Sequence, residues 1–352
     1  MAYTTIDNPE LYFQAKEYSG SSSDVTVTFD GDENMQPDWV WLKSKASGDH
    51  LAYDSVRGVN MRLQPNATDA EVDRSSNNDE LKSFNSDGWT LGTFNSNVTG
   101  AGNSCVSWNW KAGGSASSNS NGSITSSVSA NTTAGFSIVA YTGNETAGAT
   151  VGHGLGAVPQ TYWVKSRSVA DGWRIYHDKV SSDPETDYLI LNATNANADS
   201  HGYWNDTAPT SSVFSLGAAG EVNTNSSTNI AYCFAEKQGF SKFGSFVGNS
   251  NTNGTFIYTG FRPSLVIAKV ASDTNDWFMF DNKRSSFNAV DDSLFPNKSD
   301  AESTSHVIDF LSNGFKIRDS DGTVNSTGNT YIYMAFAEAP FVNSNGVPCN
   351  AR

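Results

Sequence analysis

The amino-acid sequence contains one unit three times over, and this internal repeat limits what the chain can fold into. One marker is a proline followed by an apolar run that ends in lysine: Pro37 to Lys43, Pro159 to Lys165 and Pro263 to Lys269. A second marker is the aromatic-rich run that closes each unit and contains Trp110, Phe234 or Phe336. The prolines lie 122 and 104 residues apart, and the closing aromatic residues lie 124 and 102 residues apart. Because both markers keep the same spacing, we predict three tandem units of about 100 residues.

Further markers occur between these two, in the same order in each unit. About ten residues after the lysine, an aromatic residue is followed directly by a polar one, which is Asp54, His177 or Asp281. An apolar-to-asparagine step comes next and ends at Asn66, Asn192 or Asn297. Several ordered markers in three copies make coincidence remote.

The repeats are expected to be all-β. Runs such as 24–29, 137–141 and 330–336 are rich in β-branched and aromatic residues, and Asp-Gly and Asn-Gly turn pairs separate such runs. No segment sustains the apolar spacing of an amphipathic helix. Short strands and turns in units of this length predict three β-sandwiches in series, of the jelly-roll or lectin-like type.

The markers also predict the boundaries. The first repeat covers 1–112, the second 135–240 and the third 241–341, and a C-terminal tail follows at 342–352. Residues 113–134 are a Gly, Ser, Asn and Thr tract with few apolar residues, which predicts a flexible linker or an extended arm. The junction between the second and third repeats is short and carries aromatic residues. We therefore expect these two repeats to pack closely and the first repeat to be attached more loosely.

Charge and composition exclude several classes of protein. The chain has 22 Lys and Arg against 37 Asp and Glu, a formal net charge of −15, and no basic cluster. It is therefore a poor partner for nucleic acid, and no apolar stretch is long enough to insert into a membrane. The N-terminus lacks the layout of a signal peptide. The three cysteines, Cys105, Cys233 and Cys349, show no metal-ligand spacing, so we expect neither a metal nor a cofactor.

The repeated polar residues Asp54, His177 and Asp281 are the most suggestive candidates for a functional site. In one interpretation they contact a ligand or a metal ion. In the other, each is a strand-end side chain that bonds the backbone of the following turn. The second interpretation is favoured because one copy replaces a carboxylate with an imidazole. No motif for a nucleophile, a metalloprotease or a phosphate-binding loop is present, and no carboxylate pair recurs, so we expect no enzymatic activity.

Two loops hold further candidates. Tyr203 and Trp204 lie in a loop without a clear counterpart in the other repeats, and they are the best candidates for a surface contact with a glycan. The alternative, which is favoured, is that this loop folds its aromatic residues back over its own repeat. Asp319 and Asp321 resemble the opening of a calcium loop, but the glutamate that completes such a loop is missing.

Six long motifs resemble a family of marine bacteriophage structural proteins: residues 1–14, 35–43, 53–58, 151–156, 207–217 and 308–316. The resemblance covers nearly the whole chain. It implies a tail-fibre-like or lectin-like virion protein of phages that infect cyanobacteria and other marine bacteria. The family is defined by fold and gene context more than by an activity, so the resemblance supplies no catalytic residues.

We therefore predict a non-enzymatic virion surface protein of a tail fibre or tail tip, which contacts glycans on the host surface. It is expected to assemble in the host cytoplasm with other virion proteins and to form a homo-oligomer, a trimer if it is a fibre. One alternative is a capsid decoration or head-fibre protein that cements the shell. A third is a polysaccharide-degrading virion enzyme, which requires two carboxylates that face one groove.

Overall fold

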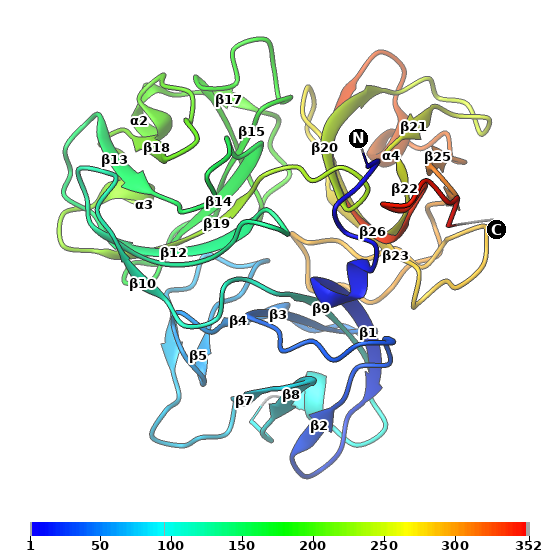
Figure 1. Cartoon of the computed structure of the whole chain (residues 1–352), viewed down its shortest axis with the longest axis horizontal. Coiled ribbons are helices and arrows are strands. Elements are labelled where there is room, and N and C mark those ends of the chain that lie inside the picture. Colours follow the sequence, from blue (N-terminus) through cyan, green and yellow to red (C-terminus); the bar gives the residue numbers. More distant parts are fainter. Residues whose placement is uncertain (1, 95, 350–352) are drawn as a thin grey trace.

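The computed structural model describes residues 2–94 and 96–349, and this part of the chain is built almost entirely of β-strands (Figure 1). The helices are single turns of three or four residues: η1 (Pro9–Leu11), α1 (Ser96–Thr99), α2 (His201–Trp204), α3 (Gly220–Asn223) and α4 (Gly322–Asn325). The prediction of an all-β fold is confirmed. Within the described residues, none of the helices has the length and apolar character needed to cross a membrane.

Three antiparallel sheets share one strand order, in which the opening strand pairs with the closing strand and two middle strands follow. In the first repeat the strands are β1 (Phe13–Ser19), β9 (Ser104–Trp110), β3 (Trp39–Ser44) and β4 (Leu51–Asp54). In the second they are β12 (Phe136–Thr142), β19 (Thr228–Phe234), β14 (Thr161–Ser166) and β15 (Arg174–His177). In the third they are β20 (Ser241–Val247), β26 (Thr330–Pro340), β22 (Phe261–Val270) and β23 (Trp277–Asp281).

Each repeat also has a smaller second sheet. These sheets consist of β2 (Val25–Val27), β8 (Gly88–Leu91) and β7 (Leu81–Asn85); β13 (Ala149–Gly152) and β18 (Val213–Leu216); and β21 (Phe256–Tyr258), β25 (Gly314–Ile317) and β24 (Ile308–Leu311). The remaining short strands are β5 (Met61–Arg62), β6 (Val72–Asp73), β16 (Asp187–Ile190) and β17 (Ala198–Asp199). The last two extend the large sheet of the second repeat at one edge.

The tract 113–134 is neither a flexible linker nor a free arm. It forms β10 (Ser117–Asn119) and β11 (Ser126–Asn131), and β11 pairs along its length with β12, so that the sheet of the second repeat has eight strands. The Asn121-Gly122 pair lies in the loop of this hairpin. Composition gives a wrong prediction here because the backbone N–H and C=O groups of Ser and Thr can pair with a neighbouring strand even where their side chains bury little apolar surface.

The three large sheets meet in one shared core, and the first repeat is not loosely attached. Trp39 stacks on Trp110 of its own repeat and on Tyr232 of the second, each with 4.4 Å between ring centroids. Phe336 of the third repeat contacts Phe13 of the first at 5.2 Å and Phe234 of the second at 5.8 Å. Aromatic side chains from all three repeats therefore exclude water from a common centre.

The opposite faces of these sheets pack inside their own repeats. β3 shows this directly, because Trp39 and Trp41 belong to the shared core whereas Val40 and Leu42 pack beneath the smaller sheet of the first repeat. All six residues of β3 are buried, which explains why this strand lacks a polar face.

The first and last described segments of the chain contact each other beside the third repeat. The backbone N–H of Ser344 donates to a carboxylate oxygen of Asp7 at 2.7 Å. The predicted tail, 342–352, thus begins as a segment held against the N-terminal segment; residues 350–352 lie outside the described residues.

Replacement of Trp39 by alanine tests whether the core is shared. This variant loses ring contacts with two repeats, so we expect its free energy of unfolding to fall by about 3–5 kcal/mol, with one cooperative transition in calorimetry. Phe287→Ala, at a side chain that is 80% exposed, should change stability by less than about 0.5 kcal/mol. An early separate transition of the first repeat in Trp39→Ala would contradict a shared core.

Candidate functional site

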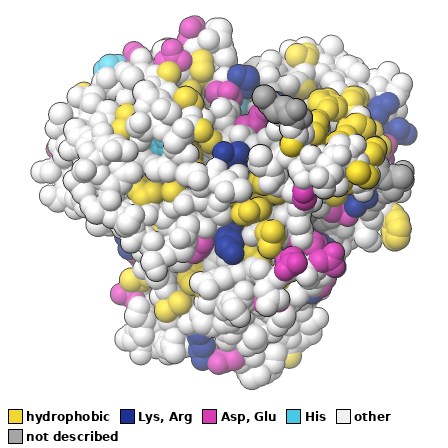
Figure 2. Space-filling model, in the orientation of Figure 1, with side chains coloured by type: hydrophobic (Ala, Val, Ile, Leu, Met, Phe, Trp, Pro, Cys, Tyr) yellow, Lys and Arg dark blue, Asp and Glu magenta, His cyan; other side chains and the backbone are white. Residues whose placement is uncertain are grey.

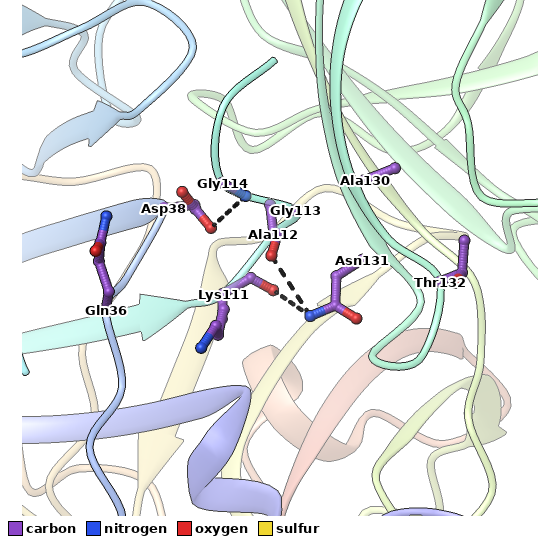
Figure 3. A pocket seen from close by; sticks show the side chains of 9 residues that line it. All are labelled: Gln36, Asp38, Lys111, Ala112, Gly113, Gly114, Ala130, Asn131 and Thr132. Carbon is purple, nitrogen blue, oxygen red and sulfur yellow. Dashed lines mark hydrogen bonds between the residues drawn. The ribbon is translucent and has the colours of Figure 1, made fainter. Parts of the chain in front are cut away.

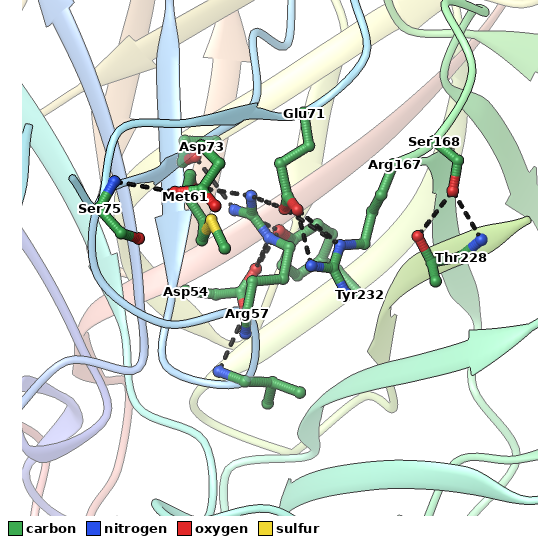
Figure 4. A network of polar contacts seen from close by, with 12 residues as sticks. Asp54, Arg57, Met61, Glu71, Asp73, Ser75, Arg167, Ser168, Thr228 and Tyr232 are labelled. Atoms are coloured by element: carbon green, nitrogen blue, oxygen red, sulfur yellow. Dashed lines mark hydrogen bonds and ion pairs between the residues drawn. The ribbon is translucent and has the colours of Figure 1, made fainter.

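Asp54 lies at the end of β4, and its buried carboxylate joins the first repeat to the second (Figure 4). Oδ1 accepts the backbone N–H groups of Val56 and Arg57 at 3.0 and 2.8 Å, as the strand-end interpretation requires. Oδ2 accepts the Arg57 side chain and also the hydroxyl of Tyr232, at 2.7 Å. The carboxylate is thus satisfied by its own turn and by a side chain of the next repeat.

A chain of ion pairs extends from this carboxylate to the surface of the second repeat. Arg57 donates to Glu71 at 3.0 Å, and Glu71 also accepts Arg167 of the second repeat at 2.6 Å (Figure 4). Burial alone would lower the pKa of Arg57, but the surrounding acidic groups, Asp54 foremost with Tyr232 and Glu71, together outweigh it and hold that pKa above its usual value. Arg57 therefore stays charged, and the pairs are structural.

Asp281 makes the equivalent junction between the third repeat and the first. Its carboxylate accepts Arg284 at 2.6 Å and the indole N–H of Trp108, in the first repeat, at 3.0 Å. Arg284 continues to Glu302 at 3.0 Å, which pairs with Lys45 of the first repeat at 3.3 Å. The aspartate–arginine pair three residues apart is thus present in two of the three repeats.

His177 makes the third junction with different chemistry. Its Nδ1 accepts the N–H of Lys179 at 3.1 Å, so Nε2 carries the proton and donates to the carbonyl of Tyr333, in the third repeat, at 3.2 Å. Burial lowers the pKa of His177 to about 4, so the imidazole is neutral at physiological pH. The three predicted residues therefore lie at three separate junctions and do not converge on one site.

The lysine of the first marker is also structural. Lys43, Lys165 and Lys269 are fully buried, and each ammonium group donates to backbone carbonyl groups at the end of its strand. Burial lowers the pKa of each to about 8.

The interpretation of Tyr203 and Trp204 as a surface contact is wrong, and the favoured alternative, in which the loop folds its aromatic residues back over its own repeat, is confirmed. Trp204 is fully buried, and its indole N–H donates to the carbonyl of Asp187 at 2.9 Å. Tyr203 is 7% exposed, and its hydroxyl bonds Glu221 at 3.0 Å. The turn α2 folds its aromatic residues against the second repeat, so neither ring offers a face to a glycan.

Asp319 and Asp321, the candidates for a calcium loop, use their carboxylates in hydrogen bonds to neighbouring residues. Asp321 accepts the N–H of Thr323 at 2.7 Å and begins α4, while Asp319 bonds the N–H of Asp321 and the ring of His306. In the part of the chain that the structure describes, no group of three or more His, Cys, Asp and Glu residues could hold a metal ion.

An open cavity of about 400 Å³, lined by both polar and small apolar residues, lies between the first repeat and the 113–134 hairpin (Figure 3). Gln36, Asp38 and Lys111 line one side, and Ala130, Asn131 and Thr132 line the other, with residues 112–114 between them. Asp38 is 2% exposed, and its carboxylate accepts Ser55 at 2.8 Å and the N–H of Gly114 at 3.2 Å. Burial raises its pKa.

Sequence reasoning missed this cavity. Asp38 directly follows the repeated Pro37, where the other repeats have uncharged residues, and Lys111 is the last charged residue before the insertion. A comparison of the repeats for charges unique to one copy would have found both.

Tyr232→Phe tests the junction at Asp54, because it removes only the hydroxyl that donates to the buried carboxylate. We expect the free energy of unfolding to fall by about 1.5–3 kcal/mol, the range for a hydrogen bond to a charged group. Tyr162→Phe is the matched control, since its buried hydroxyl has no hydrogen-bond partner among the residues that the structure describes. Denaturant unfolding measures both; equal changes in the two variants would show that the junction contributes nothing.

His177→Gln tests the neutral imidazole. The unfolded state binds a proton near pH 6.5 and the folded state only near pH 4, so the free energy of unfolding falls as pH drops between these values. The histidine accounts for about 3 kcal/mol of this loss, and the variant should lack that part. Thermal melts from pH 7 to 4 measure it, with His201→Gln, at an exposed side chain, as control. A wild-type acid profile in His177→Gln would contradict the assignment.

Comparisons with known proteins give one match. A family model described as a domain of unknown function, DUF7483, matches residues 8–340. No curated protein and no solved structure matches the chain significantly. The chain therefore belongs to the DUF7483 family, a domain of unknown function.

Proposed function

We propose that this chain is a non-enzymatic surface protein of a bacteriophage virion, located in the tail fibre or tail tip, where it contributes to contact with host-surface glycans. Six long motifs that resemble marine phage structural proteins support the source. The protein acts as a rigid scaffold that carries a contact surface through assembly and adsorption.

One observation carries the scaffold role: the repeated polar side chains are used between repeats. Asp54, Asp281 and His177 each bond a group of another repeat. The backbone makes a second set of such contacts, because Glu71, Asn197 and Glu302 donate their N–H groups to strand ends of the second, third and first repeats. These contacts join the three repeats into one body, as a scaffold requires.

An apolar surface on the third repeat supports contact with neighbouring proteins. Val247, Phe256 and Tyr258 are 54%, 45% and 53% exposed, and two of them lie on β21, an edge strand. Figure 2 shows hydrophobic side chains gathered in this region. Large exposed apolar groups on one face are typical of interaction surfaces, and here they fit a second copy of the chain or another virion protein.

The capsid decoration role remains the alternative, because the same rigid body and apolar surface suit a cement protein. A polysaccharide-degrading role would need two carboxylates across one groove. The described cavity between the first repeat and the hairpin has one carboxylate, Asp38, among its lining residues.

Gold-labelled antibody against this protein, applied to intact virions and viewed by electron microscopy, tests the proposal. We expect label at the tail. Label over the head would replace the tail assignment with capsid decoration, and intact particles without label would overturn the virion proposal. Release of reducing ends from host polysaccharide by the purified protein would contradict the non-enzymatic role.

A further inference from the structure

The 113–134 hairpin is the largest departure from equivalence among the three repeats. The sheet order of the first and third repeats, as far as the structure describes them, has no strands at the position of β10 and β11. Insertions into one copy of a repeated scaffold tend to lie on the binding face, because the scaffold itself is fixed by packing. This hairpin forms one wall of the open cavity described above (Figure 3).

The main chain is fitted closely to form that wall. A Cβ atom on Gly113 would lie 2.5 Å from the carbonyl oxygen of Ala130, so only glycine allows the chain to pass against β11. Gly114 has a φ of +76°, which also favours glycine, and its N–H points to the Asp38 carboxylate. The cavity is therefore a defined feature of the fold.

The two charged groups of the cavity, Asp38 and Lys111, are found in the first repeat alone. Gln160 and Ser264 occupy the position of Asp38 in the other repeats, and both are used inside their own sheets. Gln160 accepts the N–H of Glu236 at 2.6 Å, and Ser264 donates to Asn282 at 2.9 Å. The position of Lys111 is taken by alanine in both other repeats. The common fold therefore requires neither Asp38 nor Lys111.

Several of these groups are available to a ligand. Among the described residues, the side chains of Lys111, Gln36 and Thr132 have no hydrogen-bond or ion-pair partner, although Lys111 is half-buried. Asp38 is fixed by two donors and, as a carboxylate, can accept further hydrogen bonds. The cavity therefore offers a buried acceptor, a cation, an amide and a hydroxyl within one concave site.

This combination selects the class of ligand. The carboxylate and the ammonium group balance each other, which disfavours strongly charged ligands. A sugar hydroxyl both donates and accepts, so neighbouring hydroxyls of one ring can donate to Asp38 and accept from Lys111 or Gln36. The volume of about 400 Å³ lies within the usual range for small-ligand sites. We infer that this cavity binds a neutral sugar residue through Asp38, Lys111 and Gln36.

The inference rests on the proposed glycan contact and specifies its site. The test measures binding of methyl glucoside, methyl galactoside, methyl mannoside and methyl N-acetylglucosaminide to the full chain by saturation-transfer and chemical-shift NMR. Lys111→Met keeps the aliphatic stem and removes a charged donor, so we expect about ten- to hundredfold weaker binding. Gln36→Ala should weaken binding severalfold.

Lys179→Met is the matched control, because it removes one positive charge at an exposed side chain far from the cavity residues in sequence, in the second repeat. Wild-type affinity in this control, together with the loss in Lys111→Met, supports the site. Unfolding midpoints of all variants are measured alongside, and Asp38→Asn is added to test the acceptor separately.

The outcomes separate this inference from the proposed function. Equal binding by wild type and Lys111→Met, or no binding of any of the four glycosides, overturns the cavity assignment. The virion role is tested separately by the antibody label, and label on virions would leave it intact. Binding of sulfate or phosphate at the cavity, without binding of the glycosides, overturns the neutral-sugar class. Sugar binding by a protein absent from virions would overturn the virion role and keep the site.

Discussion

The fold depends on buried polar groups that each repeat satisfies for another. A carboxylate removed from water is stable only when donors replace its hydration, and Asp54 obtains one of those donors, Tyr232, from the second repeat. Asp281 obtains Trp108 from the first repeat in the same way. A single repeat would leave these charges underpaired and one face of its sheet exposed. The three repeats are therefore stable together, as one closed body around the shared aromatic core.

The exception at His177 follows from the same requirement. The closing strand of the third repeat carries Met334 where the other two carry Tyr232 and Trp108, and a thioether cannot donate a hydrogen bond. A carboxylate facing it would lack its cross-repeat donor. The second repeat instead has a neutral imidazole that donates to a backbone carbonyl of Tyr333, and Val180 stands where the other repeats have arginine. The second repeat thus has an imidazole donor in place of a carboxylate acceptor, because the neighbouring repeat offers a carbonyl acceptor there in place of a side-chain donor.

Much of the local structure could be predicted from the sequence, because strands and turns depend on nearby residues. The apolar run after each proline forms a central strand, β3, β14 or β22. The side chains of Asn66, Asn192 and Asn297 each accept a backbone N–H at or just before the start of the next strand in the chain, which is β4, β15 or β23. The arrangement around one core could not be predicted. Alternation tells which side chains are buried, but it does not tell which sheet covers them. The expectation of a loosely attached first repeat rests on the composition of 113–134, and it is wrong because the sheet of that repeat packs into the shared core.

The error at 113–134 has a physical cause. Composition predicts a free tract, whereas the structure of this segment depends on the long-range pairing of β11 with β12. Trp204 lies in the interior of the second repeat, as the fold-back interpretation expects.

The differences among the repeats are more informative about function than their similarities. Residues kept in all three copies, such as the buried lysines, serve contacts that every copy must make. A charged residue present in one copy has no such role, and burying it carries a cost unless a partner compensates. Asp38 and Lys111 are of this kind, and both line the cavity closed by the insertion. In a chain whose framework is repeated, a cluster of unrepeated polar groups in a concave site is the part that the framework does not explain, and ligand recognition is the role that its chemistry fits.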